Sequence, residues 1–154
     1  MLFKVSTNKL DIDNSLLEHI DNQEIKKLFT NFCNKLKLNN FDLVFKSVSK
    51  EQIKDLNFRF SGNNYPTDIL TFNNDNGADI VISIEIVREN SNKYNTREPD
   101  ELMTVISHGL LHSIGMDHQN REEQEEFLNI QNYLLASSSI DLTISFEFFD
   151  RIKE

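Results

Sequence analysis

The sequence predicts an α+β fold: a small mixed β-sheet covered by helices, with a central metal-binding helix. Short alternating segments rich in β-branched residues stand among longer segments of helical periodicity, without a strict strand–helix–strand order. The most apolar helical segment, at 102–114, suits a helix packed on the sheet. The 154 residues contain no repeat and no linker, so we expect a single layer-type domain over 1–154, with 136–154 as a variable C-terminal tail.

The first part of the chain contains two predicted strands and two predicted helices. The segment at 2–7 alternates apolar and polar residues and predicts a strand. Apolar residues recur at helical spacing from 13 to about 36 and predict one long helix. A second strand is predicted at 41–48, and a short helix at 51–58 begins after Ser49, a favourable N-cap.

The remainder contains a hairpin and the metal-bearing helix. A polar turn between two apolar strands, at 68–72 and 79–86, predicts the hairpin. Proline at position 99 fits the first turn of a helix, and a last helix follows an acidic start. The predicted segments are a loop at 60–70, a short helix or loop at 87–95, the apolar helix at 99–115 and the last helix at 121–136. The tail either adds a strand or packs loosely.

Three of the four histidines, His108, His112 and His118, lie in the run HGLLHSIGMDH. Four residues make about one helical turn, so His108 and His112 project from the same face of a helix. Gly115 allows the helix to end and the chain to turn back towards it, which brings in His118. Three imidazoles leave one position open on a tetrahedral metal, as in catalytic zinc sites. We therefore predict one Zn²⁺ per chain, and a structural role for the isolated His19.

The residue after the first histidine argues against peptide hydrolysis. Zinc proteases with this histidine spacing place a glutamate there as general base. This chain has Gly109, followed by Leu110 and Leu111, and none of the three can transfer a proton. A hydrolase with another way of handling protons is favoured, and a zinc-dependent protease-like hydrolase remains the alternative.

Composition indicates the cellular setting. The net charge of −9, from 25 acidic and 16 basic residues, lacks the basic footprint of a general nucleic-acid-binding protein. A single cysteine, Cys33, excludes an intramolecular disulfide and suits a reducing compartment. The N-terminal segment lacks the pattern of a secretory signal, and no run approaches the roughly 20 apolar residues of a membrane span. We expect a soluble cytoplasmic protein with no membrane partner.

Three segments together resemble the YbeY family of bacterial metal-dependent endoribonucleases, which act in ribosomal RNA maturation. HGLLHSIGMDH, at 108–118, resembles that family's HGxLHLxGYDH. LNFRFSGNNYPTDILTF, at 56–72, resembles LNxxYRxxxxPTDVLSF, and ADIVIS, at 78–83, resembles GDIxIS. The resemblance covers roughly residues 56–135. It implies a small α/β sandwich with the metal helix behind the sheet, and the three histidines as metal ligands.

Further positions match or depart from the family pattern. Asp117 falls on the acid before the last histidine, where it either orients a ligand ring or caps the turn, and Asp79 falls on the acid of Gly-Asp-Ile. Positions matching the proline–threonine–aspartate segment are Pro66, Thr67, Asp68, Leu70 and Phe72. Departures that leave the metal ligands intact are Ser113, Met116 and Ala78.

The departure that bears on catalysis is Ser61, which stands where the family has an arginine. Arg59 lies two residues earlier, and in an extended segment the two side chains would share a face. On that geometry Arg59 would supply the positive charge of the cleft. The other interpretation is a solvated arginine with no role in the site.

The resemblance implies a hydrolase: a single-strand-specific endoribonuclease acting in late small-subunit ribosomal RNA processing, including 3′-end maturation, and in ribosome quality control. Ribosomal RNA and the small ribosomal subunit are the implied partners. The metal would lower the pKa of a bound water or polarise a phosphate oxygen. Beyond the metal ligands, the residues identify no catalytic group. An alternative of another class is a non-catalytic ribosome assembly factor with structural zinc.

Overall fold

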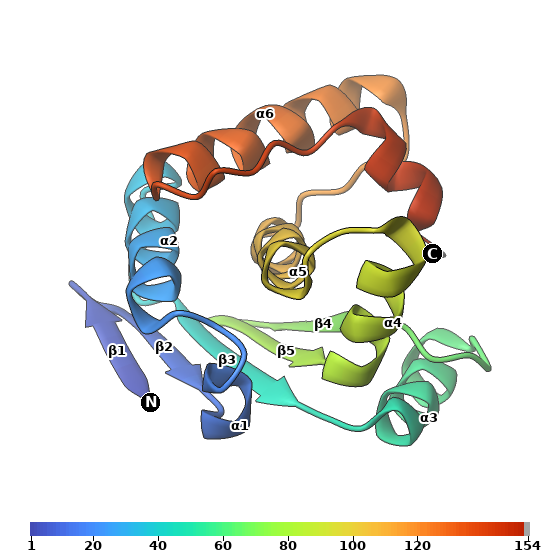
Figure 1. The fold of residues 1–154 in the computed structure, drawn as a ribbon. Helices are drawn as coiled ribbons and strands as arrows, with labels where there is room; N and C mark the ends of the chain where they lie inside the picture. The colour runs from blue at the N-terminus through green and yellow to red at the C-terminus, as the bar shows by residue number, and fades with distance from the viewer. Residues whose placement is uncertain (153–154) are drawn as a thin grey trace.

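The fold is built on a mixed β-sheet of five strands in the computed structural model, which describes residues 1–152 (Figure 1). The spatial order of the strands is β1-β2-β3-β5-β4. The central pairs, β2–β3 and β3–β5, are parallel, whereas β1–β2 and β4–β5 are antiparallel hairpins at the two edges. The strands are β1 (Leu2–Val5), β2 (Asn8–Ile12), β3 (Asp42–Ser47), β4 (Ile69–Asn74) and β5 (Gly77–Ile82). The predicted α+β class with a mixed sheet is confirmed.

Helices cover the sheet, and α5 lies between the sheet and α6, as Figure 1 shows with α5 seen end-on. The helix that carries His108 and His112 is therefore the central one, as predicted. The helices are α1 (Asn14–Leu17), α2 (Asn22–Lys35), α3 (Lys50–Ser61), α4 (Ile84–Tyr94), α5 (Glu98–Ser113) and α6 (Arg121–Ser137), followed by the 3₁₀ helix η1 (Phe146–Arg151).

Burial and polar contacts fix α5 in this position. Every residue from 101 to 111 is buried, and proline stands in the first turn as predicted. Gln131 of α6 donates from Nε2 to the Thr104 carbonyl at 3.2 Å and to Ser107 Oγ at 2.8 Å. These bonds satisfy buried polar groups between the two helices and fix their register. Among residues 1–152, no helix is both long enough and apolar enough to cross a bilayer.

The single thiol is part of the core. Cys33 lies on α2 with 2% of its surface exposed, among apolar side chains that form one buried cluster. Burial raises the pKa of this thiol to about 12, because the charged thiolate is poorly solvated there. Cys33 therefore behaves as a small apolar residue.

The N-terminal prediction was wrong in two respects. The predicted helix at 13–36 is two helices, because the Asp21 side chain accepts hydrogen bonds from the Gln23 and Glu24 amides and starts α2 as its N-cap. Asp13 caps the short α1 in the same way. Strand β2 was missed: its five residues are too few to stand out as a periodic segment, and it forms by pairing with β1 and β3.

Two element boundaries after β3 also differ from prediction. Helix α3 begins with a capping box between Ser49 and Gln52 and continues through Ser61, which was predicted to be a loop residue. It ends where Gly62 takes the left-handed conformation, with φ of +73°. The predicted hairpin is present, but its second strand ends at Ile82, because Ser83 caps α4.

The tail forms no strand within the described residues. Asn132 of α6 accepts from the Ile144 amide at 2.7 Å and donates to the Ile144 carbonyl at 2.9 Å, so the segment after α6 runs back along that helix. The chain then forms η1, where Phe148 packs against His108 and Phe149 against His118. Residues 153–154 of the predicted tail lie outside the described residues.

Candidate metal centre

The three histidines come together through the end of α5. His108 and His112 lie one turn apart on the helix. Beyond its last residue, the Gly115 amide donates to the His112 carbonyl at 3.0 Å and the Met116 amide to the Leu111 carbonyl at 3.1 Å, which is a Schellman motif. Gly115 has φ of +84°, a conformation that glycine adopts at little cost. The chain reverses there and returns His118 to the other two, as predicted.

The Nε2 atoms of the three rings converge on one point. His112 Nε2 lies 2.8 Å from His108 Nε2 and 3.2 Å from His118 Nε2, and the candidate ligand atoms all lie within 4.8 Å of one another. Two nitrogens bound tetrahedrally to one zinc at about 2.0–2.1 Å would lie about 3.3 Å apart. The His112–His118 spacing of 3.2 Å is close to this value, and the His112–His108 spacing of 2.8 Å is about 0.5 Å shorter. Imidazole ligands suit zinc, as they also suit copper, iron and nickel. The cluster can therefore hold a metal ion.

Aromatic rings surround the histidines on the side of α6 and the tail. The buried ring of Phe127 lies 4.9 Å from His108 and 5.3 Å from both His112 and His118, measured between centroids. From η1, Phe148 lies 5.6 Å from His108 and Phe149 lies 4.8 Å from His118. These contacts restrict the orientation of the three imidazoles and keep one side of the site apolar.

Asp117 caps the loop that carries His118. Its Oδ1 accepts from the His118 amide at 2.8 Å, and its Oδ2 accepts from the Gln119 side chain at 3.2 Å. These two contacts agree with the capping role considered for Asp117. Elsewhere, His19 Nδ1 lies 3.6 Å from Glu98 Oε1 at the start of α5, which agrees with the structural role predicted for it.

Gly109 faces the sheet rather than the histidines. A Cβ placed there would lie 2.6 Å from Cδ1 of Ile69 and 3.7 Å from Cδ1 of Ile80. A side chain at this position would require the end of the Ile69 side chain to move, and it would leave the helix towards β4 and β5. The protease-type base is therefore absent, and its position faces the sheet.

An open cavity of about 860 Å³ adjoins the metal centre. Its wall includes His108 and His112 from α5 and residues from α3, α4, β4 and the tail. Some of the positions that match the family pattern line this cavity, and others lie elsewhere. Pro66, Thr67, Asp68 and Leu70 line the cavity, Phe72 packs edge-on against Phe60 with centroids 5.1 Å apart, and Asp79 is exposed.

The prediction for Arg59 was wrong. Arg59 and Ser61 belong to α3, so they do not share an extended face, and side chains two positions apart on a helix point in different directions. Arg59 Nε pairs with Asp55 Oδ2 at 3.1 Å, and 67% of its side chain is exposed. Ser61 lines the cavity. Arg59 is the solvated arginine of the other interpretation.

The side chain of Asp68, in the cavity wall, has a raised pKa. Burial raises the pKa of its carboxyl to about 6, and the nearby charge of Glu101 acts in the same direction. The Thr67 hydroxyl lies 3.4 Å from Asp68 Oδ1, a contact that opposes the shift. A carboxyl that titrates close to neutral pH can both accept and donate a proton, so Asp68 is a candidate acid–base group.

Asp68→Asn is expected to stabilise the fold at neutral pH but not in acid. The pKa of Asp68 is about 6 in the folded chain and about 4 in an unfolded one, so the folded state binds more protons between these values. Stability from this group therefore falls as the pH rises from about 4 to 6, and asparagine removes that loss. We expect the free energy of unfolding to increase by about 1–3 kcal/mol near pH 7.5 and to be unchanged below about pH 4.

Urea unfolding of both proteins across this pH range measures the effect. Asp75→Asn, in the exposed β4–β5 turn, is the matched control for removal of one negative charge. A stability difference between Asp68→Asn and the unsubstituted protein that stays constant with pH would contradict the assignment of the shifted pKa to Asp68.

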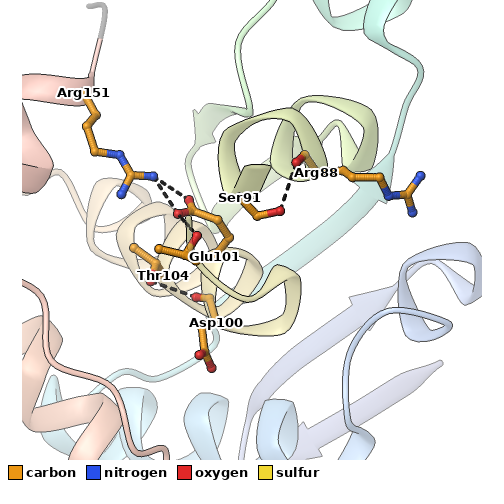
Figure 2. Close-up of polar contacts among 7 residues, drawn as sticks. Arg88, Ser91, Asp100, Glu101, Thr104 and Arg151 are labelled. Carbon is orange, nitrogen blue, oxygen red and sulfur yellow. Dashed lines mark hydrogen bonds and ion pairs between the residues drawn. The ribbon is translucent and has the colours of Figure 1, made fainter. Parts of the chain in front are cut away.

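Sequence reasoning missed a buried ion pair in the cavity wall. Arg151 Nη2 lies 2.7 Å from both carboxylate oxygens of Glu101 (Figure 2). The two residues are 50 positions apart, so no local pattern links them. An acidic residue directly before the apolar run at 102–114, within the predicted helix, was the one available signal, because a carboxylate that is buried there requires a partner.

Known proteins resemble this chain in sequence and in structure. The sequence profile of the family described as Endoribonuclease YbeY matches residues 9–139. A curated Endoribonuclease YbeY from Treponema pallidum (strain Nichols) is 35% identical over 111 residues, which are 64% of this chain and 69% of the relative. One from Thermotoga neapolitana is 45% identical over 74 residues, 47% of this chain and 50% of the relative. The solution structure of TM1509 from Thermotoga maritima superimposes with a TM-score of 0.60 and 29% identity, covering 84% of this chain and 88% of that one.

Proposed function

The chain belongs to the YbeY endoribonuclease family, and from this membership we propose that it is a zinc-dependent hydrolase that cleaves single-stranded RNA. The observation that carries the proposal is the convergence of the Nε2 atoms of His108, His112 and His118 beside an open cavity. These residues would hold one Zn²⁺ per chain beside the cavity. Zinc bound there would supply a Lewis acid for phosphodiester hydrolysis.

One residue of the cavity supports a role in proton transfer, and two exposed residues of α3 support binding of the RNA strand. Asp68, with its pKa near 6, can take a proton from the attacking water or return one to the leaving oxygen. Helix α3, which lines part of the cavity through Asn57 and Ser61, also exposes Phe58 and Phe60, with 56% and 67% of their surfaces accessible. Exposed rings of this kind stack with unpaired bases, and this supports single-stranded rather than duplex RNA as substrate.

We further propose that the substrate is ribosomal RNA of the small subunit, cut during late processing that includes 3′-end maturation, with a role in ribosome quality control. The small ribosomal subunit would then be the partner and the cytoplasm the site of action. The net charge of −9 supports a structured ribonucleoprotein target, because a protein this acidic gains little from non-specific attraction to phosphates. Gly109 carries no side chain that could act as general base, and this disfavours the protease alternative.

Metal removal tests the proposal. We expect the purified protein to contain about one equivalent of zinc and to cut a labelled single-stranded RNA. A chelator should stop cleavage, and added Zn²⁺ should restore it, because the proposed reaction depends on the metal as its Lewis acid. A duplex of the same sequence is the control and should remain intact. Cleavage that persists after the protein has lost all its metal would contradict the proposal.

A further inference from the structure

Positive charge is scarce in the cavity beside the histidines. The chain carries a net charge of −9, and an RNA strand brings one negative charge with each phosphate. Among residues 1–152, the lysine and arginine side chains that line the cavity are Lys93 and Arg151. Arg151 lies in η1, beyond residue 139, where the family match ends.

A buried carboxylate holds Arg151 in place. Both oxygens of Glu101 accept hydrogen bonds from Arg151 Nη2 at 2.7 Å (Figure 2), and the Thr96 hydroxyl donates to Glu101 Oε1 at 2.8 Å. The Glu101 side chain is 2% exposed, against 22% for Arg151. The guanidinium therefore has a defined position at the cavity wall, unlike the arginine of an exposed ion pair.

Aromatic rings fix the plane of the guanidinium and connect it to the metal centre. Its central carbon lies 3.7 Å from the Tyr94 ring centroid and 5.1 Å from that of Phe148, in cation–π geometry. Phe148 also packs against His108, so one ring contacts both the arginine and a candidate ligand. On α5, Glu101 and His108 are seven residues apart, which is two turns or about 10 Å along the same face.

The guanidinium retains hydrogen-bond donors that Glu101 does not use. Arginine has five N–H groups, and the bonds to Glu101 all come from Nη2. Nη1 points away from Glu101 in Figure 2. Nε is buried and makes no hydrogen bond within the described residues. Donors without acceptors are unfavourable, so a ligand with several acceptor oxygens would complete this site.

We propose that Arg151 is a substrate-binding residue that donates from Nη1 to a phosphate of single-stranded RNA in the cavity. The proposal rests on the ribonuclease function proposed above. Glu101 acts as a positioning residue, because it holds Nη2 and leaves the other terminal nitrogen to the ligand. The planar guanidinium offers directed hydrogen bonds together with its charge, and this suits a phosphate.

RNA binding as a function of salt tests the role of Arg151. We expect Arg151→Ala to weaken binding of a fluorescent single-stranded RNA about tenfold at about 0.1 M salt. The slope of log K against log salt should become shallower by about 0.7, the value for one lost phosphate contact on a single strand. Fluorescence anisotropy of the zinc-loaded protein measures both on a hydrolysis-resistant phosphorothioate analogue of the RNA, with a gel after each titration to confirm that the strand is intact.

Arg59→Ala is the matched control, because it removes the same charge from an exposed arginine on α3 and should leave the slope unchanged. Since Arg151→Ala leaves Glu101 buried without its partner, the double variant Glu101→Gln, Arg151→Gln is tested as well. It removes both charges and should show the same shallower slope. Melting temperature and zinc content, measured on each variant, report a purely structural effect.

Two outcomes are distinguishable. If the unsubstituted protein cleaves RNA but both Arg151 variants keep its salt slope, Arg151 is only a structural contact between the tail and α5, and the present proposal is overturned. If the unsubstituted protein neither binds nor cleaves RNA, the ribonuclease function itself fails, and this proposal fails with it.

Discussion

His112→Ala is expected to lower RNA cleavage by roughly a thousandfold or more, because a catalytic metal supplies several kcal/mol of transition-state stabilisation and each 1.36 kcal/mol is a factor of ten. His112 is the residue to replace, since its Nε2 lies 2.8 and 3.2 Å from those of His108 and His118. Two imidazoles alone bind zinc far more weakly. Elemental analysis measures the expected loss of zinc, and an RNA cleavage assay measures the expected loss of activity.

His19→Ala is the control, because it removes a histidine that lies against Glu98 instead of the cluster, and it should retain both zinc and activity. Binding of the His112→Ala protein to small ribosomal subunits separates the enzyme from a non-catalytic assembly factor. An enzyme whose only lost function is cleavage keeps subunit binding. If His112→Ala still cleaves RNA at an undiminished rate, the histidine cluster is not the catalytic centre.

Gly77→Ala is expected to reduce the free energy of unfolding by about 4 kcal/mol or more, a cost typical of severe backbone clashes. Gly77 opens β5 where it pairs with Asp42 of β3, and its φ is +154°. A Cβ at this position would lie 1.8 Å from the Asp42 carbonyl oxygen, which is main chain and cannot rotate away. Because β5 supports α5, separating β3 from β5 would also disturb the metal centre.

Gly62→Ala provides the comparison for that prediction. Gly62 also has positive φ, at +73°, but a Cβ there meets no atom within 4 Å. The cost should therefore be only the left-handed conformation itself, about 1 kcal/mol. Chemical denaturation of both variants measures the difference. Equal costs for the two substitutions would show that the clash with Asp42 is relieved by a small backbone shift.

The sequence predicted the histidine cluster well because its geometry is local. The spacing of His108 and His112 follows from the helical repeat, and the return of His118 follows from a glycine at the helix end. The cavity wall was predicted poorly for the opposite reason. Glu101 and Arg151 meet across 50 residues, through the path of a tail whose packing no local pattern reveals. The Arg59 prediction failed because α3 continues to Ser61, past the predicted end at residue 58.

The position of η1 has a consequence for the order in which the site is completed during translation. Phe148, Phe149 and Arg151 are synthesised after every other described residue that contacts the histidines or holds the cavity wall, apart from Ile152. A nascent chain that ends at α6 already contains the three imidazoles and Phe127, but it lacks one aromatic wall and the guanidinium. Such a chain, still attached to the ribosome, would carry the three histidines before it contained Arg151, the residue proposed to bind a phosphate.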